Sequence, residues 1–228
     1  MPFINIHTHQ LKSKEKNNIV VLNQTIRDEV FNTVSDAENY FTYRTFGLHP
    51  WYTDEKNYSD GLEKLENLLL DNKIIAVGEC GLDKLRGLDL DFQIKVFEAQ
   101  LHLAEKYQRP VIIHCVRAFN EVIENKKKVN PSVPLIVHGF NNNINILKQL
   151  LAAGFYISLG AAVLKDDEKS KTAWKEKIKI IPLERVFFET DDSNVDIEDI
   201  YNCAAEFFGL PIEKLQHQIA ENFEFVFR

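Results

Sequence analysis

The sequence contains little that would indicate disulfides, a membrane span or a leader peptide. Its 228 residues include three cysteines, Cys80, Cys115 and Cys203, which lie far apart and show no CxxC spacing. Because three is an odd number and no zinc-knuckle pattern is present, we interpret them as reduced thiols. No apolar run approaches the ~18 residues of a membrane-spanning helix, and residues 1–5 lack the basic stretch of a signal peptide. We therefore expect a cytoplasmic protein without a membrane partner.

Positive charge is also in deficit. The chain has 27 lysines and arginines against 34 aspartates and glutamates, which gives a formal net charge of -7. Such a molecule repels a phosphate backbone, so tight non-specific binding to duplex DNA is not expected. Bound divalent cations would add positive charge that this count omits, and a phosphodiester substrate therefore stays open.

Linkers, low-complexity stretches and internal repeats are absent as well, so nothing divides the chain. Hydrophobic residues make up 45% of the sequence, which is enough for one sizeable core. Since α/β barrels often use roughly 200 to 250 residues as one unit, we expect a single domain over residues 1–228.

Short apolar runs rich in β-branched residues recur along the chain, with amphipathic helical segments between most of them. This alternation is typical of βα units around a parallel sheet. Eight runs predict strands at 3–6, 19–22, 45–48, 74–77, 111–113, 135–137, 155–159 and 186–188. Eight strands predict a single (β/α)8 TIM-type barrel.

The segments at 10–18 and 35–38, which connect predicted strands, allow two more predictions. Residues 10–18 are polar and too few for a full crossover helix, so we expect a truncated first βα unit and a distorted barrel. Residues 35–38, Ser-Asp-Ala-Glu, have the form of a capping box and predict the start of a helix.

Ionisable side chains gather where the predicted strands end, which in a barrel is the edge that carries the active site. These residues are His7, His9, His49, Glu79, His114, His138, Glu189 and Asp191. His7 and His9, two positions apart on one strand, point to the same side. By contrast, His102 and His217 fall on helical segments and are interpreted as surface residues.

Any one of these residues alone is compatible with a structural role. Together they indicate a metal site, because burying so many unpaired imidazoles and carboxylates is costly without a cation to organise them. Imidazoles with carboxylates suit Zn²⁺ or Mn²⁺, whereas Mg²⁺, which remains open, favours an all-oxygen shell.

The motifs and their order carry a resemblance that runs from end to end. They are Ile6-His7-Thr8-His9, Gly-Leu-His-Pro at 47–50, Val-Gly-Glu-Cys-Gly-Leu-Asp at 77–83, Pro-Val-Ile-Ile-His at 110–114, Val-His-Gly-Phe at 137–140, Glu-Thr-Asp at 189–191 and Glu-Asn-Phe at 221–223. In these features the chain resembles the TatD-like metal-dependent hydrolases of the amidohydrolase superfamily, which include deoxyribonucleases.

The resemblance implies two divalent metal ions that activate a water for hydrolysis. One ion would be held by His7, His9, Glu79 and Asp191, and the other by Glu79, His114 and His138, with Glu79 bridging. It further implies His49 as a substrate-facing residue that hydrogen-bonds a phosphate oxygen. We expect Asp191 to act as the base and Glu189 to orient a ligand.

Three positions depart from the family pattern. Asn5 stands where an aspartate is usual, Arg117 follows His114 by three residues instead of two, and Asp-Ser-Asn at 192–194 replaces the usual small residue and proline. The basic phosphate-binding loop expected beyond Asp191 is missing.

Three functions follow as hypotheses. The first is a phosphodiesterase or deoxyribonuclease that acts on a small phosphodiester or on a single-stranded DNA end. The second is an amide or lactone hydrolase of the same superfamily, in which many enzymes bridge the metals with a modified lysine where this chain has Glu79. The third is a degenerate member that binds metal without turnover, which Asn5 and the displaced arginine motivate.

Overall fold

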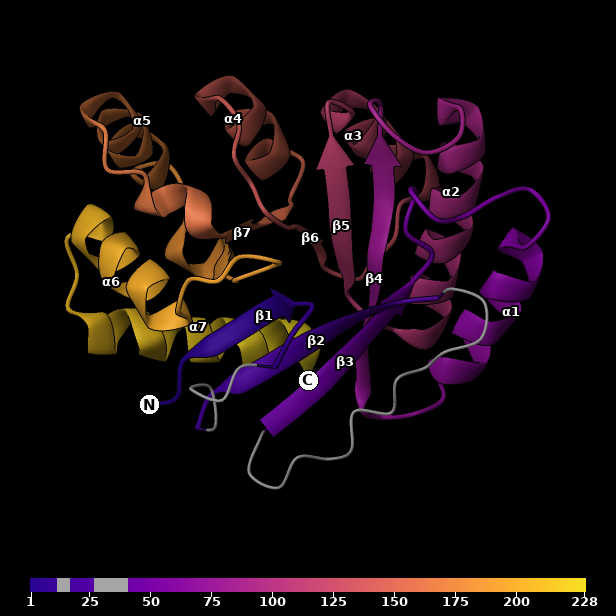
Figure 1. Cartoon of the computed structure of the whole chain (residues 1–228), viewed down its shortest axis with the longest axis horizontal. Helices are drawn as coiled ribbons and strands as arrows, with labels where there is room; N and C mark the ends of the chain where they lie inside the picture. Colours follow the sequence, from indigo (N-terminus) through magenta and orange to yellow (C-terminus); the bar gives the residue numbers. More distant parts are fainter. Residues whose placement is uncertain (12–16, 27–40) are drawn as a thin grey trace.

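Eight parallel strands form one sheet that curves into a barrel in the computed structural model, which describes residues 1–11, 17–26 and 41–228 (Figure 1). The strands pair in chain order. They are β1 (Ile4–Thr8), β2 (Ile19–Thr25), β3 (Phe41–Gly47), β4 (Ile74–Asp83), β5 (Val111–Val116), β6 (Leu135–Val137), β7 (Tyr156–Leu159) and β8 (Val186–Phe188). The predicted (β/α)8 barrel is confirmed.

Two segments that follow β8 contact β1 at its opposite ends. At the carboxyl end, Thr8 pairs with Asp191 in an isolated parallel bridge, and the Asp191 N–H donates to the carbonyl of His7 at 3.0 Å. At the amino end, the buried Tyr201 hydroxyl donates to the carbonyl of Ile4 at 3.0 Å and accepts from its N–H at 3.2 Å. The first contact brings the chain after β8 directly against the end of β1.

Helices cover the outside of the barrel (Figure 1). The described residues form α1 (Tyr58–Leu68), α2 (Leu90–Tyr107), α3 (Phe119–Val129), α4 (Ile144–Ala152), α5 (Glu168–Ile178), α6 (Ile197–Phe208) and α7 (Ile212–Phe227). The side chains of Asp89, Asn143 and Asp167 accept backbone N–H groups at the start of α2, α4 and α5, which satisfies donors that a helix leaves unpaired. None of the helices described is long and apolar enough to cross a membrane.

The final helix closes the barrel at the end opposite to the ionisable residues. Asn222 on α7 donates to the carbonyls of Leu183 and Val186, at the start of β8, at 2.7 and 3.0 Å. Gln216, one turn and a half earlier, donates to the carbonyl of Met1. The carboxyl ends of the strands are therefore left as the accessible end.

Most strand boundaries agree with the predicted runs, and the differences have a common cause. β3 begins at Phe41 rather than residue 45, because all seven of its residues pair with β2 in register, from Ile19 with Phe41 to Thr25 with Gly47. Residues 41–44, Phe-Thr-Tyr-Arg, alternate aromatic and polar residues and contain no continuous apolar run, so the predicted run begins after them. β4 likewise continues to Asp83, where pairing with β5 carries it past the predicted end.

The first connection, between β1 and β2, has no helix in its described residues, 9–11 and 17–18. This agrees with the short first unit expected there. The capping box predicted at 35–38 lies outside the described residues.

Candidate metal centre

The carboxylate of Glu79 lies at the mouth of the barrel with imidazoles on both of its sides. Its Oε1 is 2.7 Å from Nδ1 of His114, 2.9 Å from Nε2 of His138 and 3.0 Å from Nε2 of His49. The residue is buried and retains 3% of its exposure. One carboxylate oxygen thus contacts three imidazole rings, which come from the ends of β3, β5 and β6.

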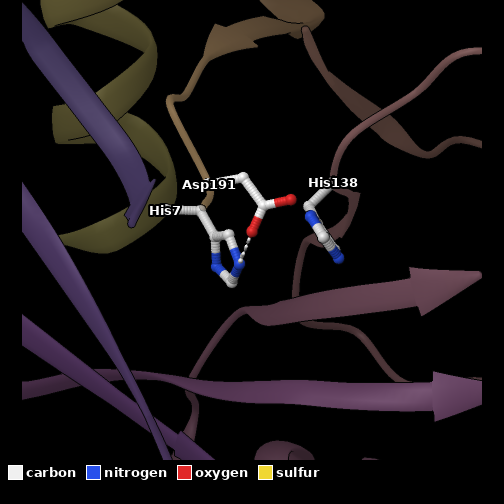
Figure 2. Close-up of side chains that lie close together, drawn as sticks. All are labelled: His7, His138 and Asp191. Atoms are coloured by element: carbon white, nitrogen blue, oxygen red, sulfur yellow. Dashed lines mark ion pairs between the residues drawn. The ribbon is translucent and has the colours of Figure 1, made fainter. Parts of the chain in front are cut away.

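The other oxygen of Glu79 faces the end of β1. Its Oε2 lies 3.4 Å from Nε2 of His7 and 3.5 Å from Nε2 of His9. Oδ1 of Asp191 lies 3.6 and 3.4 Å from the same two nitrogens. Figure 2 shows the Asp191 carboxylate directed toward His7, with the His138 ring from the loop after β6 beside it.

These four distances suit a cation placed between the groups. Two ligand atoms that each lie about 2.1 Å from a tetrahedral ion are about 3.4 Å apart, close to the spacing between the His7 and His9 nitrogens and the carboxylate oxygens. Both ring nitrogens of His7 are buried and find no hydrogen-bond partner among the described residues. A buried imidazole without a partner is costly unless a ligand satisfies it, so the donor set fits a bound divalent ion.

The position of Glu79 is set by its neighbours on β2 and β3. The Glu79 N–H donates to Oδ1 of Asn23 at 2.7 Å, and Nδ2 of Asn23 approaches Oε2 of Glu79 at 3.4 Å. The Thr45 hydroxyl donates to the same Asn23 oxygen at 3.0 Å. Gly47 is required beside them, since a Cβ there would lie 2.6 Å from the carbonyl oxygen of Glu79. Asn23 was not predicted, because the run of apolar residues ends just before it.

Two outer carboxylates orient the rings that face Oε1. Oε1 of Glu189 lies 3.2 Å from Nδ1 of His138 and accepts the Gly139 N–H at 2.7 Å. Oδ2 of Asp83 lies 3.2 Å from Nε2 of His114. A carboxylate that accepts one ring N–H leaves the lone pair of the opposite nitrogen facing the centre. Glu189 lies where the sequence predicted an orienting group, whereas Asp83, although part of a family motif, was given no role.

His49 has a different hydrogen-bond pattern. The backbone N–H of Trp51 donates to its Nδ1 at 3.1 Å, so the ring proton is on Nε2 and can be donated toward Oε1 of Glu79. Burial lowers the pKa of His49, and the ring is therefore neutral near pH 7. Its contact with a substrate phosphate stays a prediction.

The electrostatics of the centre favour ionised carboxylates. Burial raises the pKa of Glu79, but His138 and the other rings outweigh this and hold it well below its usual value. Burial also raises the pKa of Asp191, but hydrogen bonds with His7 and His9 lower it more, so that the net change is a large decrease. In return, against the effect of burial, Asp191 and Glu79 raise the pKa of His9 to about 10, and Glu79 with Glu189 raises that of His138.

These groups open into a cavity of about 230 Å³. It is lined by His9, Thr25, His49, Trp51, Tyr52, Glu79, His114, His138, Asp191 and Asp192. The structure therefore brings together all six predicted metal ligands and His49, with His7 beneath the cavity floor. His102 and His217 are exposed on α2 and α7, as expected.

The three departures from the family pattern lie in different parts of the structure. Asn5 exchanges two hydrogen bonds with Thr190, at 2.8 and 3.1 Å, and so ties β1 to the segment after β8. Arg117 is exposed at the end of β5, with a φ of 54°. Asp192 is also exposed and adds negative charge beside His9 and Asp191. The segment after β8 is thus acidic at the point where a basic loop was expected.

A parallel barrel with imidazoles and carboxylates gathered at the carboxyl ends of its strands defines a class, the TIM barrels with a candidate metal centre at that end. Within that class the chain belongs to the family of TatD-related DNases, whose family model matches residues 6–228. The crystal structure of YjjV, the TatD homologue from Escherichia coli K12, has the same fold. It superposes with a TM-score of 0.83 at 24% identity and covers 99% of this chain and 97% of that one.

Curated relatives of this chain carry nuclease names. The 3'-5' ssDNA/RNA exonuclease TatD of Erwinia billingiae is 31% identical over 66% of this chain and 58% of its own length. The deoxyribonuclease Tat-D of Schizosaccharomyces pombe is 30% identical over 72% of this chain and 54% of its own. The match thus spans less than two thirds of either relative.

Proposed function

We propose that this chain, with residues 1–228 acting as one catalytic domain, is a metal-dependent phosphodiesterase that hydrolyses DNA from single-stranded ends. The observation that carries the proposal is the carboxylate of Glu79, whose two oxygens face two separate groups of ligand-type side chains. A carboxylate in this position can bridge two cations, and paired cations suit phosphodiester hydrolysis.

The proposed ligands divide along the two oxygens of Glu79. One divalent ion would be held by His7, His9, Glu79 and Asp191, and the second by Glu79, His114 and His138. Although His49 also reaches Oε1, we assign it no metal, because the Trp51 N–H occupies its Nδ1 and leaves its Nε2 as a donor. The imidazole content favours Zn²⁺ or Mn²⁺ over Mg²⁺.

When bound, the divalent ions would activate a water and neutralise charge on the phosphate. The chain's own residues would supply the proton transfers. Asp191 has a side chain that is 41% exposed and lines the cavity, so its carboxylate is placed to take the proton of the attacking water. His49 is a neutral donor on the cavity wall, and its Nε2 proton, which faces Oε1 of Glu79 here, would turn to a phosphate oxygen once a metal ion binds Oε1.

The size and charge of the site favour a strand end as substrate. A cavity of about 230 Å³ is too small for a duplex to enter. The net charge of -7 opposes the extended backbone contacts that duplex tracking requires. A single-stranded end needs few such contacts, and the nuclease names of the relatives agree with this choice.

The proposal is tested by hydrolysis assays with Mn²⁺, Zn²⁺ or Mg²⁺ on labelled single-stranded and duplex oligonucleotides and on a chromogenic phosphodiester. Glu79→Gln removes the bridging charge, and Glu213→Gln, an exposed change on α7, is its matched control. We expect metal-dependent cleavage of the single strand that is lost in Glu79→Gln and kept in Glu213→Gln.

Two results would contradict the proposal. Hydrolysis of cyclic amides or lactones in the same buffers, without phosphodiester cleavage, would point to the other branch of the superfamily. No turnover of any substrate by protein that binds two ions per chain would indicate a non-catalytic member.

A further inference from the structure

One cation near the cavity has no carboxylate partner. Arg86 lies in the loop between β4 and α2, and its guanidinium carbon stands 4.0 Å from the centre of the Trp51 ring. It forms no ion pair with any residue in the described part of the chain, whereas the nearby Lys84 is paired with Glu121. Because Trp51 lines the cavity, this unpaired positive charge lies beside its wall.

The loop that carries Arg86 is held by a buried amide. Gln93 is 4% exposed, and the two hydrogens of its Nε2 are shared among the carbonyl oxygens of Asp83, Arg86 and Leu88, which lie 3.0, 3.1 and 2.7 Å away. Its Oε1 accepts the Asp83 N–H at 2.7 Å. Contacts from this one side chain to four backbone groups fix the course of the loop, so the exposed Arg86 starts from a defined backbone position.

A glycine lets the same loop approach the segment after β3. Gly87 has a φ of +93°, and a Cβ on it would lie 2.4 Å from the carbonyl oxygen of Pro50. Only glycine accommodates both this φ and this distance without strain. The loop therefore packs directly beside Trp51, which explains how the guanidinium reaches the ring.

Trp51 in turn contacts residues of the candidate metal centre. Its indole N–H donates to Oδ2 of Asp83 at 2.6 Å, and its ring lies 4.9 Å from His49 and 5.3 Å from His114 between centroids. Tyr52, 37% exposed, follows it on the cavity wall. Arg86 thus stands one aromatic ring away from the groups that would hold the scissile phosphate.

The chemistry of this arrangement suits a second phosphate. A guanidinium stacked on an aromatic ring keeps its N–H edge free for paired hydrogen bonds to phosphate oxygens. The cavity lining also includes the carboxylates of Asp191 and Asp192, which repel a phosphate that no metal ion neutralises. The next phosphodiester of a bound strand would accordingly be drawn toward Arg86.

We propose that Trp51 and Arg86 form a subsite for the phosphodiester next to the scissile one, so that the enzyme prefers a nucleic-acid strand to an isolated phosphodiester. This inference rests on the proposed function, because it assigns the scissile phosphate to the centre around Glu79. The positive charge that the family pattern predicts in the loop after β8 would then come from Arg86, in the loop after β4.

The test compares a substrate that reaches the subsite with one that cannot. KM and kcat are measured for a labelled single-stranded oligonucleotide and for a chromogenic diester with one phosphate, in Mn²⁺, between 50 and 200 mM salt. The variants are Arg86→Ala, Arg86→Lys, which keeps the charge but not the planar stacking, and Lys214→Ala. Lys214 is exposed on α7 at the other end of the barrel, and its loss changes the net charge equally.

We expect Arg86→Ala to raise KM for the oligonucleotide about tenfold more than for the small diester, as for loss of one charge-assisted contact. Its dependence of log(kcat/KM) on log[salt] should become shallower by about 0.7, the contribution of one phosphate contact on a single strand. Arg86→Lys should fall between the two, and Lys214→Ala should match the wild type. Equal losses on both substrates, or an unchanged oligonucleotide KM, would overturn the proposal.

Failure of the proposed function has a different signature, which is that the wild type cleaves neither substrate. Fluorescence anisotropy of the oligonucleotide with metal-loaded protein then decides the subsite by itself. Binding that weakens about tenfold in Arg86→Ala supports it, and binding that is absent, or insensitive to Arg86, rules it out.

Discussion

Replacing Asp83 by asparagine tests whether an outer carboxylate sets the ring orientation on which the second ion depends. Oδ2 of Asp83 receives the Trp51 indole N–H at 2.6 Å and faces Nε2 of His114 at 3.2 Å, while Oδ1 accepts the Leu85 N–H at 2.7 Å. An asparagine has one oxygen for these three donors, and its NH2 group would oppose an N–H. The His114 proton should then move to Nδ1, the nitrogen that faces Glu79 at 2.7 Å.

The expected cost follows from that tautomer change. Loss of an outer partner of a histidine ligand lowers metal affinity about 10- to 100-fold, which corresponds to about 1.4 to 2.8 kcal/mol. The loss should fall on the ion held by His114 and His138 and spare the ion between His7 and His9. Titration of Zn²⁺ or Mn²⁺ against a fluorescent chelator resolves the two affinities.

The matched control is Asp167→Asn at the start of α5, where asparagine caps a helix as well as aspartate does. Nitrogen NMR of the His114 ring reports the tautomer directly. If Asp83→Asn binds both ions with wild-type affinity and leaves the proton of His114 on Nε2, the reasoning is refuted.

Three further outcomes are expected. The pKa of His9 is raised to about 10, and that of His138 is raised well above its usual value. Both rings are therefore protonated in metal-free protein at pH 7.5, and each ion must displace a proton to bind. Calorimetry of Mn²⁺ binding in buffers of different ionisation enthalpy should therefore show release of at least one proton per chain and an affinity that increases with pH toward 10; no release would contradict these assignments. Tyr201→Phe removes the buried hydroxyl that joins both backbone groups of Ile4, and urea unfolding should show a loss of about 1 to 3 kcal/mol, against little change for the exposed Tyr52→Phe. Glu189→Gln keeps one oxygen for the Gly139 N–H but places an amide near His138, so metal affinity should fall about tenfold while the thermal midpoint of metal-free protein moves little; an unchanged affinity would remove Glu189 from the orienting role.

The strands were predictable because a strand that is buried on both faces has a short continuous run of apolar residues. All eight runs correspond to strands in the structure. The candidate ligands were predictable for a related reason, since residues that end neighbouring parallel strands meet at one edge. The early start of β3 is not predicted by a search for apolar runs, because residues 41–44 alternate aromatic and polar residues while they pair with β2.

The groups around the ligands were harder to predict. Asn23 and Asp83 act through contacts with residues 56 and 31 positions away, and neither has a local pattern that distinguishes it from a polar loop residue. The position of Arg86 likewise depends on how Gln93 and Gly87 pack in the loop that carries it. Such roles depend on how strands and loops come together, which spacing along the chain does not record.

The most direct test of the account is an anomalous difference map from crystals grown with Zn²⁺ or Mn²⁺. We expect two peaks, one on each side of the Glu79 carboxylate. One should lie between Oε2, His7, His9 and Asp191, and the other should lie beside Oε1, His114 and His138. A single peak away from Glu79, or no peak among these residues in protein that binds metal in solution, would contradict the bridging role on which the proposed function depends.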